Sequence, residues 1–251
     1  MLADDLRYAL DPVAFAAEVV RFTTPDSWQT RALRWSGKRL LLNCHRQSGK
    51  STTAAILAVH RALYRPGSLI LLISPSLRQS GELFKKVQAY LALVDNRPEL
   101  TEDNRLSFTL ATGSRVVSLP GDERTTRGFS GVDLIIEDEA SRVEDNLYRA
   151  MRPMLAVSGG SLILMSTPFG KRGHFFEEWK NPYSDWVRIE VPATENPRIT
   201  KEFLADEQRS LGSTWYRQEY MCSFEDTTNA VFPYDLVMDA LSEDVHPLWE
   251  N

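Results

Sequence analysis

The sequence predicts an α/β domain with a mainly parallel central sheet flanked by helices. Four short apolar runs lack the polar alternation of a half-exposed strand, which is typical of strands that are buried on both faces. These runs are residues 39–44, 69–73, 133–137 and 161–165. Segments with helical character separate them. Strands that alternate with helices in this way form a parallel sheet covered on both sides.

Helices and turns fill the intervals between the strands. Asp11 and Pro12 open an amphipathic helix that runs to about Phe22, and Thr24-Pro25 restarts a helix before the first strand. Later helices are expected over about 52–64, 77–94 and 145–157. Alternating residues at 105–110 and 115–119 predict a β-hairpin, and a flexible polar loop is expected over 120–131.

The pattern loosens after Phe169. Helical stretches are expected near 174–180, 201–211 and 214–220, around one strand at 186–191. We expect these stretches to form a small helical subdomain at the sheet edge, followed by a helix at 233–241.

Composition excludes several classes of protein. The 251 residues are 43% hydrophobic and 25% charged, which is ordinary for a globular domain, and no apolar run approaches the length of a membrane span. The N-terminus is acidic rather than signal-like. Two cysteines fit a reducing cytoplasm, and four scattered histidines give no zinc spacing. A net charge of −5 gives no global sign of nucleic-acid binding, although a local basic rim between Arg105 and Arg127 stays open.

The stretch 43–51, Asn43-Cys44-His45-Arg46-Gln47-Ser48-Gly49-Lys50-Ser51, follows the first strand and opens a helix. A strand, a turn ending in Gly-Lys-Ser and a helix are the layout of a phosphate-binding P-loop. Backbone N–H groups and the positive end of the helix dipole meet the phosphates. Gly49 allows close approach, Lys50 reaches the β and γ oxygens, and the Ser51 hydroxyl can ligate Mg²⁺. Cys44 stands where the first glycine is usual, so a chance Gly-Lys-Ser is the alternative.

Asp138 and Glu139 follow the third strand and support a nucleotide site. A carboxylate at the end of a buried strand is a Walker B arrangement, in which Asp138 holds Mg²⁺ opposite Ser51. Glu139 is then placed to take a proton from an attacking water. The alternative is a plain acidic turn. Glu137 occupies a position where an apolar residue is usual, and we expect it to point into a pocket or to pair with a nearby arginine.

Two polar positions border the predicted site. Ser166 and Thr167, before Pro168, end the fourth strand at the same edge as the P-loop and can hydrogen-bond the γ-phosphate or the attacking water. Gln29 precedes the first strand, and its amide can donate to and accept from the adenine edge. A strand-ending turn and a surface glutamine are the plain alternatives.

Two arginines complete the candidate site. Arg46 lies inside the P-loop, where its guanidinium can fork to phosphate oxygens. Arg127 lies in the flexible loop, eleven residues before Asp138. It is either a solvated loop arginine or a finger that reaches the ATP of a neighbouring subunit.

Together these motifs resemble the ATPase domain of the large terminase subunit of tailed bacteriophages, an ASCE/RecA-like P-loop NTPase with a small helical lid subdomain. The resemblance rests on 45–51 with its internal arginine, 126–128, 134–140, 166–168 and Trp28-Gln29. The later stretch 215–220, with Phe224 and 231–233, is similar to the end of the family's lid. The resemblance therefore covers about residues 20 to 235.

The resemblance implies ATP and Mg²⁺ as cofactors. Phosphates and metal would be bound by the P-loop, above all Lys50 and Ser51, together with Asp138, and Glu139 would be the catalytic base. The nucleotide-binding residues that it implies are Gln29, Arg46, Gln47, Ser48, Gly49, Lys50 and Ser51. The further roles that it implies are adenine contact, γ-phosphate sensing, a finger acting in trans and coupling of hydrolysis to movement, for Gln29, Arg46, Arg127 and Ser166-Thr167-Pro168 in that order.

The family also implies an organisation and a set of partners. We expect an ATPase domain over 1–225, with a core of about 20–170 and a lid of about 171–225. We expect a linker over 226–251 toward a nuclease domain that this chain lacks, and therefore no nuclease activity. The implied partners are double-stranded DNA, the portal protein of the procapsid and the small terminase subunit. We expect a homo-oligomeric ring when assembled, a monomer in isolation, no membrane, and a location in the host cytoplasm and transiently on the procapsid.

Two other functions stay open. A helicase-like DNA translocase of superfamily 2 shares these motifs, but it needs a second RecA-like domain, and no second series of strands and helices follows residue 168. A nucleotide-binding scaffold without turnover would need neither Lys50 nor Glu139 to be kept together.

Overall fold

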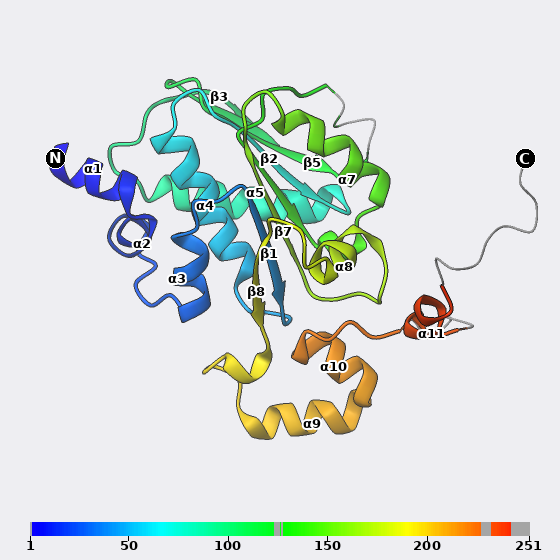
Figure 1. The fold of residues 1–251 in the computed structure, drawn as a ribbon. Helices are drawn as coiled ribbons and strands as arrows, with labels where there is room; N and C mark the ends of the chain where they lie inside the picture. The colour runs from blue at the N-terminus through cyan, green and yellow to red at the C-terminus, as the bar shows by residue number, and fades with distance from the viewer. Residues whose placement is uncertain (1, 123–125, 127, 227–231, 242–251) are drawn as a thin grey trace, which may run out of the picture.

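The computed structural model describes residues 2–122, 126, 128–226 and 232–241. Within these residues, eight strands form one sheet in the order β3-β4-β5-β2-β6-β7-β1-β8 (Figure 1). The strands are β1 (Arg39–Cys44), β2 (Leu69–Ser74), β3 (Leu100–Asn104), β4 (Ser107–Leu110), β5 (Arg115–Pro120), β6 (Leu134–Asp138), β7 (Ser161–Ser166) and β8 (Val187–Val191). The predicted α/β architecture is confirmed.

The centre of the sheet is parallel and fully buried. β7 lies between β1 and β6, and β2 follows on the other side of β6, all in parallel pairing. These four strands are the four apolar runs of the sequence, which confirms that such runs mark strands covered on both faces. The predicted hairpin is also confirmed, because β4 and β5 pair antiparallel with Phe108 opposite Val116.

Helices cover both faces of the sheet. They are α1 (Leu2–Leu10), α2 (Pro12–Ala14), α3 (Ser27–Leu33), α4 (Lys50–Tyr64), α5 (Leu77–Ala92), α7 (Asp145–Met151), α8 (Gly173–Lys180), α9 (Lys201–Leu211), α10 (Ser213–Met221) and α11 (Tyr234–Asp239). Alternate strand residues point to opposite faces, so Leu40 and Leu42 pack with α3, α4 and α5, whereas Leu41 packs with α7 and α8. Each face therefore has its own apolar core.

Three local features differ from the expectation. The predicted helix from Asp11 begins as expected, with the Asp11 carboxylate accepting from the Val13 N–H, but continues as a π-helical segment over Phe15–Val19. The hairpin gains a third strand, β3, which pairs antiparallel with β4. The strand expected near 186–191 is β8, and it extends the central sheet in parallel beside β1 instead of lying within the helical subdomain.

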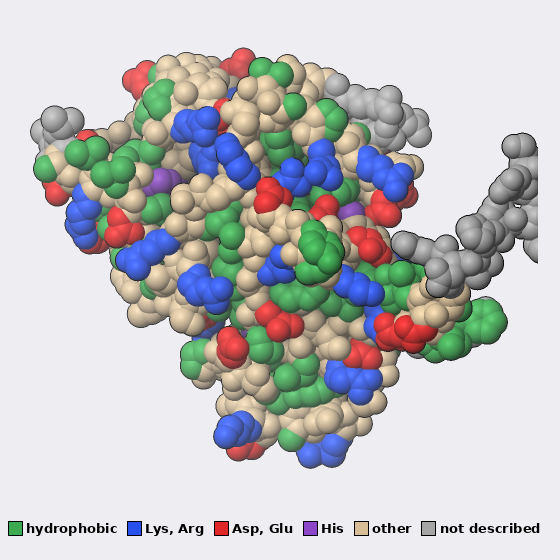
Figure 2. All heavy atoms as spheres, viewed as in Figure 1, with side chains coloured by type: hydrophobic (Ala, Val, Ile, Leu, Met, Phe, Trp, Pro, Cys, Tyr) green, Lys and Arg blue, Asp and Glu red, His purple; other side chains and the backbone are tan. Residues whose placement is uncertain are grey.

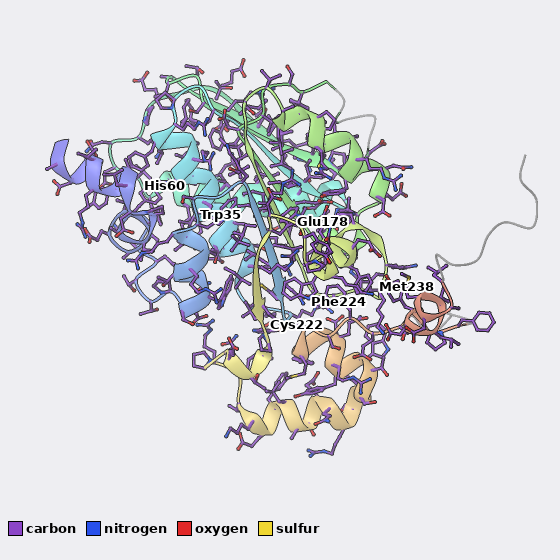
Figure 3. All side chains as sticks on the ribbon, viewed as in Figure 1. Trp35, His60, Glu178, Cys222, Phe224 and Met238 are labelled. Atoms are coloured by element: carbon purple, nitrogen blue, oxygen red, sulfur yellow. The ribbon has the colours of Figure 1, made fainter. Side chains whose placement is uncertain are left out.

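The helices α9 and α10 form a separate lobe below the sheet edge that carries β8 (Figure 1). Figure 3 shows Cys222 and Phe224 where the chain returns from this lobe toward α8. Phe224 packs against Phe175, Phe176 and Trp179 of α8. The lobe is thus anchored to the sheet domain at both of its ends, through β8 and through Phe224.

The helix α11 projects from the body and carries exposed apolar side chains, visible at the right of Figure 2. Leu236 and Val237 are exposed, and Met238 is labelled on this helix in Figure 3. In the part of the chain that the structure describes, no helix is both long and apolar enough to cross a membrane.

Candidate active site

The predicted P-loop forms the turn between β1 and α4. Two of its residues adopt the left-handed conformation, Gln47 at φ 60° and Gly49 at φ 94°. Cys44 is the last residue of β1 and is fully buried, and its backbone does not need the left-handed region. The missing glycine is therefore accommodated, because the turn takes its left-handed residues from later positions. Burial raises the pKa of the Cys44 thiol to about 12, so it stays protonated.

Lys50 and Glu139 meet at the centre of the site. The Lys50 Nζ lies 2.9 Å from the Glu139 Oε1, with side-chain exposures of 10% and 25%. Burial alone would lower the pKa of Lys50, but the Glu139 and Asp138 carboxylates outweigh it and the pKa is raised. The structure thus brings together the predicted phosphate-binding lysine and the predicted base, in a nearly buried ion pair.

Asp138 lies beside this pair at the end of β6. The Ser51 hydroxyl donates to its Oδ2 over 3.4 Å, and the Glu139 N–H donates to its Oδ1 over 3.0 Å. Burial raises the pKa of Asp138 to about 6, with Lys50 opposing the shift and Glu139 adding to it. Glu139 itself adopts a left-handed backbone at φ 55°, a conformation that is uncommon for a residue with a side chain and that occurs at functional turns.

The residues Ser51 and Asp138 fit a Mg²⁺ site. Mg²⁺ prefers hard oxygen ligands and is commonly held by one or two carboxylates together with substrate phosphates. A hydroxyl and a carboxylate oxygen already lie 3.4 Å apart at the P-loop. Among the described residues, no group of three or more His, Cys, Asp or Glu side chains could hold a metal without a substrate. A metal here would therefore take its remaining ligands from phosphates and water.

Ser166 and Thr167 lie at the end of β7, between the strands that carry the P-loop and Asp138. Ser166 is fully buried, and its Oγ lies 2.7 Å from the Ser141 Oγ. Both hydroxyls lie 2.8 Å from the Thr167 carbonyl oxygen, to which they can donate. Ser141 was not predicted from the sequence. It connects the segment after Glu139 with the predicted coupling motif, so these two parts of the site form one hydrogen-bonded unit.

Gln29 lies beneath the P-loop and is 3% exposed. Its Oε1 accepts from the Asp26 N–H over 2.9 Å, and its Nε2 donates to the Thr53 Oγ over 3.2 Å. A Cβ at Gly49 would lie 2.9 Å from the same Nε2. Gln29 therefore caps α3 and supports the P-loop, and the absence of a side chain at Gly49 makes room for it.

Arg46 reaches out of the P-loop to the helical lobe. Its guanidinium lies 3.4 Å from the Glu219 Oε2, and its backbone N–H donates to the Glu219 carbonyl over 3.1 Å. A similar contact comes from β1, because the Asn43 amide donates to the Cys222 carbonyl over 2.9 Å. The lobe thus holds the P-loop through α10 and the residue that follows it.

The environment of Glu137 corrects the expectation of an arginine partner. Glu137 is fully buried on the face of β6 away from the P-loop helix, and its Oε1 lies 3.2 Å from the His174 Nε2 without hydrogen-bond alignment. The His174 Nδ1 lies 3.1 Å from the Asp145 Oδ1, and the ring stacks on Tyr148 at 4.4 Å. Burial lowers the pKa of His174, but the two carboxylates outweigh it and the pKa is raised.

A cavity of about 340 Å³ opens from the catalytic residues toward α5. Ser51, Asp138 and Glu139 line one side of it, and Arg78 and Lys86 of α5 line the other. These two cations were not predicted from the sequence, where they look like ordinary charges of an amphipathic helix. Arg127, the predicted finger, lies outside the described residues.

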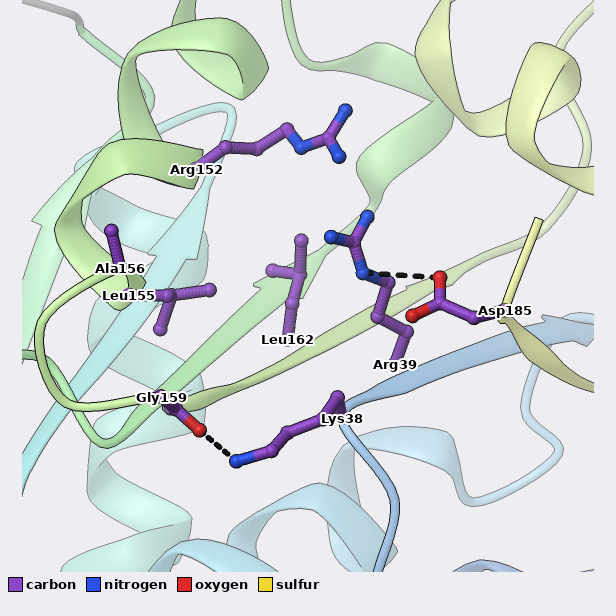
Figure 4. A pocket seen from close by; sticks show the side chains of 9 residues that line it. Lys38, Arg39, Arg152, Leu155, Ala156, Gly159, Leu162 and Asp185 are labelled. Atoms are coloured by element: carbon purple, nitrogen blue, oxygen red, sulfur yellow. Dashed lines mark hydrogen bonds and ion pairs between the residues drawn. The ribbon is translucent and has the colours of Figure 1, made fainter.

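A larger hollow of about 500 Å³ lies at the opposite edge of the sheet, where β1 and β7 begin (Figure 4). Two of its cations are occupied: Lys38 donates to the Gly159 carbonyl, and Arg39 pairs with Asp185 at 3.3 Å. Ligands of open α/β sheets bind at the carboxyl ends of the strands. The size of this hollow therefore does not make it the nucleotide site.

Comparisons with known proteins agree with this geometry. The family model described as "Terminase large subunit, T4likevirus-type, N-terminal" matches residues 42–238. The chain is 26% identical over 243 residues to the terminase large subunit of Thermus phage G20c, covering 83% of this chain and 50% of that protein. It therefore spans about half the length of the curated relatives that it matches.

Solved structures share the fold. The large terminase ATPase domain of Thermus phage P74-26 has a TM-score of 0.71 at 22% identity, covering 82% of this chain and 96% of that chain. The large terminase of another thermophilic bacteriophage, solved in complex with ADP, has a TM-score of 0.65 at 11% identity, covering 80% of this chain and 54% of that chain.

Proposed function

The chain belongs to the terminase large-subunit family of T4-like virus type, and we propose that it is the ATPase motor domain of such a subunit. It would hydrolyse ATP with Mg²⁺ and use the energy to drive double-stranded DNA into a viral procapsid. One observation supports the catalytic part above all: Lys50, Ser51, Asp138 and Glu139 meet at one edge of the sheet, at the start of a helix. Phosphate binding and water activation need this set of groups together.

Hydrolysis then begins with an exchange of partners. Lys50 is held by Glu139 over 2.9 Å when no phosphate is near. The phosphates of ATP attract Lys50 more strongly than one carboxylate, so binding releases Glu139. The freed carboxylate accepts a proton from the attacking water, and Lys50 and Arg46 balance the charge that develops on the transferred phosphoryl group. Mg²⁺, when held by Ser51 and Asp138, would neutralise phosphate charge and orient the β and γ oxygens.

The path from chemistry to movement would run through β7. The attacking water would lie between Glu139 and the end of this strand, where Ser166 and Thr167 are joined to Ser141 by hydrogen bonds. Loss of the γ-phosphate would change the position of this unit. We propose Arg127 as a finger that acts on a neighbouring subunit in a ring. The portal protein and the small subunit are proposed partners on the same grounds of family.

Replacement of Glu139 by Gln tests the catalytic assignment. We expect Mg²⁺-dependent phosphate release to fall by roughly 10²–10⁴-fold, the usual contribution of a general base, while nucleotide affinity is retained. Glu144→Gln is the matched control, since Glu144 is an exposed carboxylate shortly after Glu139 in the chain. Unchanged phosphate release in Glu139→Gln would overturn the assignment.

A further inference from the structure

The helix α5 presents a row of charged side chains to the catalytic cavity. Arg78, Glu82 and Lys86 are exposed and are spaced by four residues, so they lie on one face of the helix on successive turns. All three line the cavity of about 340 Å³ that is also lined by Asp138 and Glu139. This face is therefore continuous with the site of hydrolysis.

A second cavity of about 360 Å³ extends the same surface away from the site. It shares Arg78 and Glu82 with the first cavity and adds Lys85 of α5 and Arg105 of the turn between β3 and β4. The two cavities thus meet at Arg78 and form one channel. We refer to the cations Arg78, Lys85, Lys86 and Arg105 along this channel as the α5 track.

The track carries uncompensated positive charge. Lys85 pairs with Glu82 at 2.8 Å, whereas in the described part of the chain Arg78, Lys86 and Arg105 have neither a hydrogen bond nor an ion pair. The pKa of Glu82 is lowered, mainly by its hydrogen bond to Lys85 and further by the charges of Arg78 and Lys86. At its far end the track meets an acidic residue, because Gln88 of α5 donates to Asp103 of β3.

The spacing of these charges suits a linear polyanion. Eight residues of α-helix separate Arg78 from Lys86, a rise of about 12 Å, which is the axial length of three to four phosphates of one DNA strand. The net charge of −5 means that the chain as a whole does not attract DNA. Contact with a polyanion therefore requires a local basic surface of this kind.

We propose that the α5 track binds the phosphodiester backbone of double-stranded DNA and brings it to the edge of the cavity that contains Glu139. This inference rests on the proposed function, in which DNA is the cargo, and assigns to it a surface. Phosphate contacts position a protein on DNA without reading sequence, which suits a motor that must move any genome. Because the DNA and ATP sites share one cavity, strand movement and hydrolysis can influence each other directly.

The test is the salt dependence of DNA binding. A fluorescently labelled duplex oligonucleotide is titrated with the chain, and its anisotropy gives the affinity over a series of salt concentrations. The slope of log affinity against log salt decreases in magnitude by about 0.9 for each phosphate that the protein no longer neutralises. For Arg78→Ala/Lys86→Ala we expect the slope to decrease by about 1.8 and the affinity at low salt to fall by at least roughly tenfold.

Three further variants and one competitor make the result specific. Lys201→Ala/Arg209→Ala removes the same charge from the exposed face of α9 and is expected to keep the wild-type slope. Arg78→Lys/Lys86→Arg keeps both charges and should also keep it. Equal slopes for the alanine pair on α5 and for wild type would overturn the proposal, and so would a wild type that binds no duplex.

Polyglutamate serves as the competitor that carries charge without phosphates. If the α5 variant loses affinity for polyglutamate but not for DNA, the track takes an acidic protein segment and the proposal fails. The motor function fails by a different result, namely unchanged phosphate release in Glu139→Gln. A chain that hydrolyses ATP through Glu139 but keeps its DNA slope in the α5 variant refutes the track alone.

Discussion

The buried pair of Glu137 and His174 provides a direct test of the energetics of this fold. His174→Phe keeps an aromatic ring against Tyr148 but removes the charged group that faces Glu137. Glu137 is fully buried, and His174 is its ion-pair partner among the described residues. Breaking one side of a buried pair costs about 3–5 kcal/mol, because a charge is left without a partner in a medium of low polarity.

Thermal and urea unfolding measure this cost. For a domain of this size each kcal/mol shifts the melting temperature by about 2–4 °C, so we expect His174→Phe to melt roughly 6–20 °C below wild type. The pH dependence has a definite sign. The pKa of His174 is raised above its usual 6.5, so its stabilisation is complete below pH 6.5 and is lost as pH rises through the folded value.

Two variants show whether the charge or the packing is responsible. Glu137→Leu/His174→Phe removes both partners, and we expect it to recover most of the loss, because apolar replacements of a buried pair are often neutral or stabilising. His60→Phe is the matched control. His60 is packed between Phe15 and Tyr64 and loses only a hydrogen bond to the Tyr8 carbonyl, worth roughly 0.5–1.5 kcal/mol. The reasoning is refuted if His174→Phe melts within about 2 °C of wild type, or if the double variant is as unstable as the single one.

Two further predictions concern the catalytic residues. Burial raises the pKa of Asp138 to about 6, so its charge opposes folding above that pH; Asp138→Asn should therefore stabilise the nucleotide-free chain at pH 7.5 by roughly 1–3 kcal/mol while abolishing Mg²⁺-dependent turnover. The gain should disappear near pH 4 in melting experiments, and a melting temperature that does not rise at pH 7.5 would contradict it. Arg46→Ala should lower kcat by roughly 10²–10³-fold, because it removes charge stabilisation from the transferred phosphoryl group. Its melting temperature should change by no more than about 4 °C, since the pair with Glu219 is mostly exposed on the Arg46 side; steady-state kinetics with unchanged kcat would disprove this role.

The strands that carry the site were predictable because their signal is local. A run such as Leu69–Ser74, buried on both faces, must be apolar throughout, and a turn ending in Gly49-Lys50-Ser51 has few structural uses other than phosphate binding. The chemistry of Lys50 with Glu139 followed from the same logic, because both lie at the carboxyl ends of parallel strands. Their separation along the sequence did not matter.

Features that depend on tertiary neighbours were not predictable in the same way. The pattern of β8 marks a strand but does not say that it pairs with β1. His174 lies far from Glu137 in the sequence, and a histidine at the start of a helix gives no sign of a buried carboxylate nearby. The role of Ser141 depends on a hydrogen bond to β7 that no periodicity records. Pairwise contacts across elements, rather than the elements themselves, were the part that required the structure.

The contact between Arg46 and Glu219 has a thermodynamic consequence for the lobe of α9 and α10. One guanidinium cannot serve both Glu219 and a phosphate, so nucleotide affinity and attachment of the lobe are linked quantities. Such linkage is reciprocal: whatever draws α10 away from the P-loop raises the affinity for ATP by the factor by which ATP loosens α10. An exposed pair is worth up to about 1 kcal/mol, which limits this factor to roughly fivefold. A neighbour that presses on the lobe can therefore adjust when the site fills, but it cannot by itself hold the site empty.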